Sequence, residues 1–343
     1  MGQVVGVTNS NAEYLIERSY TPQDMLATIY RHFEIDYAAA FKDYFGFPVH
    51  NLSALVVALM SFAAIHALAE ELAGQGIKMR AMTFNIRYAN PGDGDNAWPH
   101  RRERVAEMIQ SSDVDIAGLQ EALFVQVEYL ASRLLDYEWY GVGRDDGRQA
   151  GEFSPIFYRK DRFRPVDRST YWLSTTPEKP GSKSWDAALP RIVTCLKLEE
   201  RRTKQNFWAI NTHFDHRGEN ARRESAKLIA ERIASVAGSS PVVLMGDFNC
   251  RRNSDPYRLL TAAEHAEPAF QDTFKLSAEG HEGPDSTWNG FKEVVPGQVI
   301  DFIFVRGPIG VRRHATLVAR FDGRFASDHL PVLTDLVIDV EKE

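Results

Sequence analysis

Hydrophobic residues along positions 79–338 are arranged in a way that predicts strands alternating with helices. Several short stretches are continuously apolar, which is typical of strands covered on both faces. Longer stretches place apolar residues at helical spacing, as Leu228, Ile229 and Ile233 do. The predicted helices are 99–111, 122–136 and 219–236. The predicted strands are 79–86, 114–119, 153–159, 191–198, 206–212, 241–246, 299–305 and 331–338. This alternation indicates an α/β protein.

The first 77 residues have a different pattern. Residues 52–69 carry no charged side chain and end in Ala-Leu-Ala, which is similar to a signal-peptidase site. Their length is borderline for a membrane span, and no basic segment precedes them. We therefore expect an N-terminal extension, 1–77, and a main domain, 78–343. A secreted or periplasmic location is the first expectation. The alternatives are a membrane anchor at 52–69, a cytoplasmic protein with a core helix there, or a fused upstream fragment.

The charge of the chain is concentrated in this extension. The net charge is −7 over 343 residues, and residues 1–77 hold three basic and eight acidic residues. The main domain is therefore nearly neutral, which gives no support to a large basic nucleic-acid footprint. The basic runs 101–104 and 201–204 are expected to be an exposed helix face and a hairpin turn.

Cysteine chemistry is not expected. Cys195 and Cys250 are the only two cysteines, so a disulfide framework is excluded. Cys195 lies in a strand-like apolar run and is expected to be a core residue. Cys250 follows Asn249, but no further thiol or ligand pattern accompanies it.

Polar side chains stand at the ends of several apolar strands. Asp247 and Asn249 follow the apolar run 242–245. Because side chains alternate along an extended chain, these two should leave it on one side while Phe248 points into the core. Other strand ends carry His213, Asp301, Asp328 and His329. Carboxylates, imidazoles and amides together are the groups needed for metal-assisted attack on a phosphate ester.

Glu121 closes the apolar run 116–119. A buried carboxylate is costly unless it is paired or binds a metal, and Mg²⁺ is typically held by one or two carboxylates. The alternative is an acid favoured by the dipole of the helix that follows. Asn85 ends the strand 79–86 and could orient a metal ligand, although a strand-end asparagine is also ordinary turn chemistry.

The ordered set of these residues resembles the endonuclease/exonuclease/phosphatase superfamily over about residues 79–340. The residues that carry the resemblance are Asn85, Glu121, His213, Asp247-Phe248-Asn249, Asp301 and Asp328-His329. This superfamily includes pancreatic DNase, abasic-site endonucleases, inositol polyphosphate phosphatases, sphingomyelinases and deadenylases. The resemblance implies the DNase I-like fold, a four-layer α/β (α+β) sandwich of two packed mixed sheets flanked by helices. The segments 93–98, 143–147 and 185–191 resemble a bacterial branch nearer the deadenylase-like group.

The resemblance also implies roles for individual residues. Glu121 would bind a divalent cation, Mg²⁺ with Mn²⁺ as an alternative, with Asn85 beside it and Asp328 near it. Asp247 would activate or position the water and Asn249 would orient it. The two histidines would contact the scissile phosphate, His213 supported by Glu152 and His329 supported by Asp301. Expected substrate contacts are Arg144, Arg191 and Trp288.

One position departs from the pattern of part of the superfamily. Arg87 stands where abasic-site endonucleases place a second metal-binding carboxylate. The resemblance therefore does not extend to a metal site with two acids of that kind, and abasic-site repair is not expected.

The predicted function is Mg²⁺-dependent hydrolysis of a phosphate ester in a nucleic acid, a nucleotide or a lipid head group. A phosphodiesterase of the nuclease type is the first expectation. The alternatives are a phosphomonoesterase and a phospholipid or sphingomyelin phosphodiesterase. A module that only binds a phosphorylated ligand and a carboxylate-pair glycosidase remain open, although a glycosidase leaves His213, His329 and Asn249 without a role. No protein partner is predicted.

Overall fold

A computed structural model describes residues 41–42, 48–49, 76–262 and 269–339. The chain divides into two units, Met1–Ala73 and Gly74–Glu343. In the first unit, β1 (Phe41–Lys42) pairs antiparallel with β2 (Pro48–Val49). The segment 52–69 lies outside the described residues, so export and membrane anchoring remain predictions. Within the described ranges, none of the helices has the length and apolarity that a membrane span needs.

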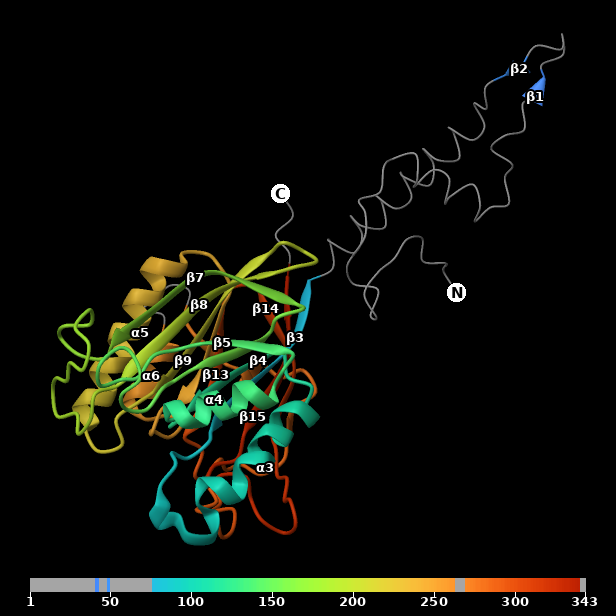
Figure 1. Ribbon diagram of the computed structural model, residues 1–343. Helices are drawn as coiled ribbons and strands as arrows, with labels where there is room; N and C mark the ends of the chain where they lie inside the picture. The colour runs from blue at the N-terminus through green and yellow to red at the C-terminus, as the bar shows by residue number, and fades with distance from the viewer. Residues whose placement is uncertain (1–40, 43–47, 50–75, 263–268, 340–343) are drawn as a thin grey trace. The chain divides into compact units, whose positions relative to one another are not determined.

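The second unit contains a six-stranded and a seven-stranded mixed sheet (Figure 1). The strand order is β11-β13-β10-β9-β8-β7 in the first and β12-β14-β15-β3-β4-β6-β5 in the second. The six-stranded sheet is built from β11 (Gln271–Asp272), β13 (Asp301–Arg306), β10 (Val242–Asp247), β9 (Asn206–His213), β8 (Ile192–Glu200) and β7 (Phe163–Trp172). The seven-stranded sheet is built from β12 (His281–Glu282), β14 (Ile309–Thr316), β15 (Val332–Ile338), β3 (Ile77–Asn85), β4 (Ile116–Gln120), β6 (Ile156–Arg159) and β5 (Tyr137–Tyr140).

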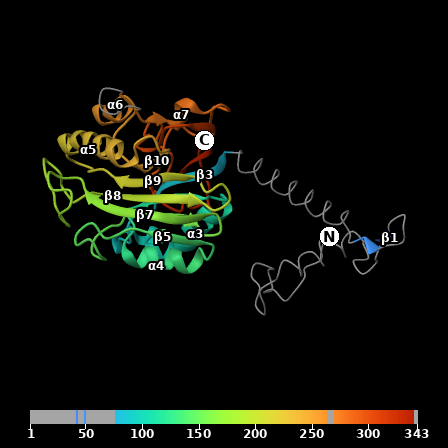
Figure 2. The ribbon, with the colours of Figure 1, turned by 90° about the horizontal axis from the view of Figure 1, so that it is seen from above.

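Helices cover the outer face of each sheet. Figure 2 shows α5 (Glu219–Ala237) and α6 (Asp255–Thr261) on one side of the strands and α4 (Phe124–Arg133) on the other. α3 (Trp98–Ser111) packs with α4 against the seven-stranded sheet. Two shorter helices, η1 (Pro91–Asn96) and α7 (Thr273–Leu276), lie in connections. The predicted four-layer, DNase I-like fold class is confirmed.

The continuous apolar runs are explained by this layering. In β10, Val242 and Leu244 pack in the core beneath α5, whereas Val243 and Met245 pack in the core between the two sheets. All four side chains are 0% exposed. Burying a side chain of this size contributes about 1.5–3 kcal/mol, so both faces of a central strand must be apolar.

A buried amide network joins the two sheets. Nδ2 of Asn211 on β9 donates to the carbonyls of Leu119 (2.7 Å) and Pro155 (2.9 Å), and Nε2 of Gln120 donates to Oδ1 of Asn211 (2.6 Å). Gly118 allows this approach, because a Cβ there would lie 2.8 Å from the Asn211 carboxamide. The ends of β4 and β9 that carry the polar residues are therefore held at a fixed separation.

All eight predicted strands are present, with ends shifted by a few residues. The region 153–159 becomes regular only at Ile156, because Phe153 forms isolated bridges to Ala122 and Gly143. The predicted helix 122–136 is shorter and corresponds to α4. Strands β5, β7 and β14 were not indicated by the hydrophobic pattern.

Candidate active site

Three of the predicted residues lie side by side across the six-stranded sheet. Asp247 at the end of β10 is in register with His213 on β9 and with Asp301 on β13. Residues in register on neighbouring strands project from the same face of a sheet. Asn85 ends β3 in the other sheet, and its Nδ2 donates to Oδ2 of Asp247 at 2.9 Å. Both sheets therefore contribute to one group of polar side chains.

Glu121 lies next to Asn85. Nδ2 of Asn85 donates to Oε1 of Glu121 at 3.1 Å, and the backbone N–H of Tyr88 donates to Oε2 at 3.2 Å. Glu121 has φ of +61°, in the left-handed region that a non-glycine residue adopts at a cost of about 1 kcal/mol or more. This turn directs the carboxylate out of the β4 strand end toward the cleft.

His329 is held by an acid. Its Nδ1 lies 2.9 Å from Oδ2 of Asp301, and its Nε2 lies 3.8 Å from Oδ2 of Asp247. Burial alone would lower the pKa of His329, but Asp301, Asp247 and Asp328 outweigh it and raise this pKa to about 10. The imidazole is therefore cationic at neutral pH, with Nε2–H directed toward the cleft.

Asp247 is a carboxyl with an unusually high pKa. Burial, together with the neighbouring charge of Asp301, raises the pKa of Asp247 to about 7. The backbone N–H of Asn249 donates to its Oδ1 at 2.9 Å. Asn249 has φ of +45°, which turns the chain just after Phe248, and the Phe248 ring is buried in the core as expected. A carboxyl poised near neutral pH is suited to accepting a proton.

His213 differs from His329 in its surroundings. Its Nε2 lies 3.0 Å from Nδ2 of Asn249, which donates, and 3.5 Å from Oδ2 of Asp247. Burial, followed by the charges of Arg191 and Arg144, lowers the pKa of His213 well below its usual value. This imidazole is therefore neutral. The two histidines approach Asp247 in opposite protonation states.

Glu152 lies near His213 but is bound to another residue. Its Oε2 is 3.9 Å from Nδ1 of His213, which is beyond hydrogen-bond distance, and 2.5 Å from Nη1 of Arg144. Burial raises the pKa of the Glu152 carboxyl. In this arrangement the direct partner of Glu152 is Arg144.

These side chains line a cleft of about 440 Å³. Of the predicted substrate contacts, Arg191 and Trp288 line it, and Arg144 lies behind Glu152 against a small adjoining void. The Trp288 ring packs edge-on against His329 at 4.9 Å. The cleft is lined by Arg87, Tyr88, Glu121, Glu152, Leu189, Arg191, His213, His216, Asp247, Asn249, Trp288, Ile300, Asp328 and His329.

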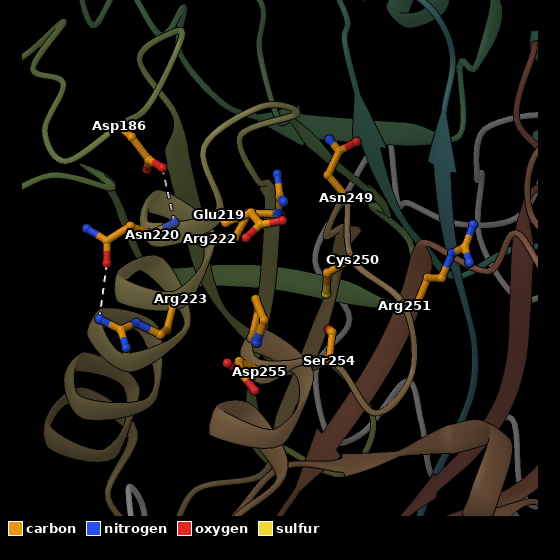
Figure 3. Close-up of a pocket in the computed structure, with 11 residues that line it drawn as sticks. Asp186, Glu219, Asn220, Arg222, Arg223, Asn249, Cys250, Arg251, Ser254 and Asp255 are labelled. Carbon is orange, nitrogen blue, oxygen red and sulfur yellow. Dashed lines mark hydrogen bonds between the residues drawn. The ribbon is translucent and has the colours of Figure 1, made fainter.

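A second pocket, of about 760 Å³, adjoins the cleft at Asn249, which lines both. Figure 3 shows this pocket between the start of α5 and the segment that carries Cys250 and Ser254. Asp186 accepts from the backbone N–H of Asn220, so its charge is engaged at the start of α5. Burial raises the pKa of the Cys250 thiol to about 11, so this thiol is protonated at neutral pH.

Comparison with known proteins identifies the family to which this chain belongs. The model of the Endonuclease/Exonuclease/phosphatase family matches residues 82–329, which include every predicted site residue. The chain belongs to this family.

Solved structures of family members superpose on most of the chain. An endonuclease/exonuclease/phosphatase from Bacteroides vulgatus is 41% identical, with a TM-score of 0.72, over 76% of this chain and 98% of that one. A mannosyl-6-phosphatase from Bacteroides thetaiotaomicron is 34% identical, with a TM-score of 0.70, over 76% and 99%. The prediction of a hydrolase of this family is confirmed at the level of the family.

Deadenylase-like proteins are related as predicted. The CCR4-Not complex 3'-5'-exoribonuclease subunit Ccr4 of Saccharomyces cerevisiae is 24% identical over 292 residues, which cover 69% of this chain and 35% of that protein. The chain spans only about one third to three fifths of the length of the curated relatives that it matches.

Arg87 occupies a central place among the acids of this family site. Its Nη1 lies 3.9 Å from Oε2 of Glu121, and its Nε lies 3.9 Å from Oδ2 of Asp328. Two hydrogen bonds of 3.0 Å to Asp93 fix the guanidinium. The sequence marked this position only as a departure from abasic-site endonucleases, whereas in the structure it places a cation between the two carboxylates.

Arg101 contradicts the prediction of an exposed basic helix face. Its side chain is 0% exposed and donates to backbone carbonyls of Ile86, Arg87 (2.6 Å) and Ala326 (3.4 Å). These carbonyls belong to the segments that carry Asn85 and Asp328. Arg101 therefore connects two segments of the family site through their backbone carbonyls. No local sequence signal revealed this role.

Oxygen donors suited to a divalent cation are present on the Glu121 side of the cleft. Glu121 and Asp328 line it, and burial raises the pKa of Asp328. A bound cation would favour the charged form of the Asp328 carboxyl, which fits the oxygen ligands that Mg²⁺ prefers. Asp247, Asp301 and His329 form a tighter group, with one potential ligand atom each within 4.8 Å of the others. Because Asp301 and His329 are hydrogen-bonded to each other, this group is better suited to proton transfer.

Proposed function

We propose that the chain hydrolyses phosphate esters by direct attack of water, assisted by a divalent cation such as Mg²⁺ or Mn²⁺. The observation that carries the proposal is the placement of Asp247 between His329 and His213. The cationic histidine can donate to a phosphoryl oxygen, and the carboxyl can accept a proton. Proton transfer by a positioned group typically contributes about 10²–10⁴-fold in rate.

Each of these residues has a step in the proposed reaction. The water oxygen bonds to phosphorus as one of its protons passes to Asp247, the bond from phosphorus to the ester oxygen breaks, and the departing oxygen takes up a proton from solvent. Nε2–H of His329 stabilises the negative charge that grows on a phosphoryl oxygen. Asn249, whose Nδ2 lies 3.0 Å from Nε2 of His213, orients the water and the phosphoryl group. The products are an alcohol and a phosphate.

Glu121, Asp328 and Asn85 are the residues that would hold the cation. Glu121 and Asp328 line the same cleft, and Nδ2 of Asn85 donates to both Glu121 and Asp247. When bound, a divalent cation neutralises charge on the phosphoryl or leaving oxygen.

The relatives support this class of reaction. One is named an exoribonuclease and another a mannosyl-6-phosphatase. The first acts on a ribonucleic acid and the second on a sugar phosphate. The proposal therefore covers nucleic acids, nucleotides, lipid head groups and phosphosugars as candidate substrates.

The test is a hydrolysis panel with Mg²⁺ or Mn²⁺ that spans single-stranded RNA, DNA, phosphoinositides, sphingomyelin and simple phosphomonoesters. We expect at least one ester to be cleaved, excess EDTA to abolish the cleavage, and Asp247→Asn to lower kcat by about 10²–10⁴-fold. Asp136→Asn, an exposed acid away from the cleft, is the control. A module that only binds its ligand would cleave nothing, and a rate unchanged by EDTA would rule out the cation.

A further inference from the structure

Arg191 lies in the wall of the cleft with hydrogen-bond donors that are not used. Its side chain is 5% exposed. Its Nη2 lies 3.0 Å from Nδ1 of His216, but Nε and Nη1 have no hydrogen-bond partner among the described residues. Burying donors of a charged group without acceptors is costly. A ligand that brings oxygen acceptors to this position would offset that cost.

The neighbouring acid compensates the charge of Arg191 without occupying its donors. Oδ2 of Asp215 is 3.7 Å from Nε of Arg191, which is beyond hydrogen-bond distance. Instead, Asp215 accepts four backbone N–H groups, from residues 188, 189, 217 and 218, at 2.8–3.2 Å. These bonds hold its pKa at about 2, even though burial opposes them. Because Asp215 fixes the chain just before Arg191, the guanidinium is preorganised.

The cationic character of this part of the cleft extends to Arg144. Nη1 of Arg144 is bound to Glu152, and its buried Nε has no hydrogen-bond partner among the described residues. Arg144, Arg191 and His213 line one small void that adjoins the cleft. The acids Glu121 and Asp328 line the cleft itself, so the site combines carboxylates suited to a cation with guanidinium groups suited to an anion.

We propose that Arg191 binds a terminal oxygen of a phosphate monoester, so that the chain cleaves monoesters in preference to diesters. This inference rests on the proposed function. A monoester has three terminal oxygens and a diester has two. In a diester, an ester substituent replaces the third oxygen, so only two terminal oxygens remain to be shared among the cation, His329 and the buried N–H groups of Arg191. Sites built to hydrogen-bond a substrate group reject analogues that lack it by up to about 10⁴–10⁵-fold.

The proposal also accounts for the product. Hydrolysis of a monoester releases the alcohol and inorganic phosphate, which keeps the terminal oxygens that Arg191 would bind. Inorganic phosphate is therefore expected to inhibit competitively. Arg191→Gln should weaken that inhibition, because the neutral amide cannot provide the paired, charged donors of a guanidinium.

The test compares kcat/KM for p-nitrophenyl phosphate and bis(p-nitrophenyl) phosphate with Mg²⁺. We expect the wild type to prefer the monoester. In Arg191→Gln, kcat/KM should fall by about 100-fold or more for the monoester and only a few-fold for the diester. Arg191→Lys keeps the charge but lacks the paired N–H donors of a guanidinium, so its decrease in kcat/KM for the monoester should be intermediate. Arg223→Gln, which changes an exposed arginine on α5, is the control. Thermal melting reports whether each variant is folded.

The outcomes separate this inference from the proposed function. A wild type that prefers the diester, or an equal loss on both esters in Arg191→Gln and Arg191→Lys, would overturn the monoester proposal and leave the phosphoesterase proposal standing. If neither ester is cleaved, calorimetric titration with inorganic phosphate and Mg²⁺ tests the anion site alone. Phosphate binding that Arg191→Gln weakens at least about tenfold would support it, and binding that is equal in both proteins would overturn it.

Discussion

Nδ1 of His329 and Oδ2 of Asp301 lie 2.9 Å apart, in a buried hydrogen bond between the segment before β15 and the first residue of β13. Both side chains are nearly inaccessible, 4% and 1% exposed. This contact sets the orientation of the cationic imidazole, with Nδ1–H toward Asp301 and Nε2–H toward the cleft. The edge-on Trp288 ring holds the same imidazole from a second direction.

Asp301→Asn should remove the charge that keeps His329 cationic. We expect kcat to fall by about 10–100-fold, the range that is typical when the hydrogen-bond partner of a metal-binding histidine is lost. Asp301 helps to raise the pKa of His329 to about 10, so its loss should lower that pKa. Activity that depends on the cationic form should then decline at a lower pH than in the wild type. The pH dependence of kcat measures this, and an unchanged alkaline limb would contradict the assigned role.

Arg87 should weaken metal binding in the wild type. Its guanidinium lies 3.9 Å from both Glu121 and Asp328, where it competes with a divalent cation for these carboxylates. At this distance two charges interact by about 4 kcal/mol near a protein surface, and screening reduces the effect. Arg87→Gln should therefore bind Mn²⁺ several-fold more tightly in calorimetric titration. Glu121→Gln should bind it at least about tenfold more weakly. Equal affinities in all three proteins would place the cation elsewhere.

The hydrophobic pattern predicted the central strands and missed those at or near the sheet edges. β10 is covered on both faces, so its apolar run has no competing explanation. β7 is an edge strand with six consecutive exposed residues, 164–169, and a bulge after Pro165. β14 is interrupted between Val311 and Arg313. An exposed or bulged strand has no regular alternation, and its pairing depends on partners that are distant in sequence.

The residue types of the site could be predicted, whereas their partners could not. Asp247, His213 and Asp301 were expected together from their positions at strand ends, and the register of β9, β10 and β13 brings them side by side. Their catalytic roles remain predictions. The burial of Arg101 had no local signal, because its partners are carbonyls of two loops that only the folded chain brings together.

Gly118→Ala should destabilise the contact between the two sheets. The new Cβ would lie 2.8 Å from the Asn211 carboxamide and 3.1 Å from Cβ of Met245. Overpacking of this kind typically costs about 1–3 kcal/mol. Gly310→Ala is a matched control, because a Cβ there has a single neighbour, at 3.8 Å. Urea denaturation should show the loss for Gly118→Ala alone. Equal free energies of unfolding would mean that the amide network moves without cost.

A histidine pair away from the cleft, of which His314 is buried, makes the fold sensitive to acid. Nδ1 of His314 on β14 lies 2.9 Å from Nδ1 of His281, whose Nε2 donates to the carbonyl of Pro284 at 3.2 Å. Burial, then the proximity of His281 and the charge of Arg252, lowers the pKa of His314 to about 3. In the folded protein this imidazole is therefore neutral, whereas in the unfolded chain its pKa is about 6.5.

His314 should therefore destabilise the protein as the pH falls. Its folded pKa lies below its unfolded pKa, so the unfolded state binds the proton more readily. The contribution of the neutral imidazole to the free energy of unfolding is fully present above about pH 6.5. It is lost as the pH falls from there toward 3, by up to about 1.4 kcal/mol per pH unit. His314→Asn keeps a donor for His281 without a titrating group, so its free energy of unfolding should fall less steeply. Urea denaturation at pH 7, 6, 5 and 4 measures the slopes, with His100→Asn on exposed helix surface as the control. If wild type and His314→Asn have the same slope, the acid sensitivity arises from other groups.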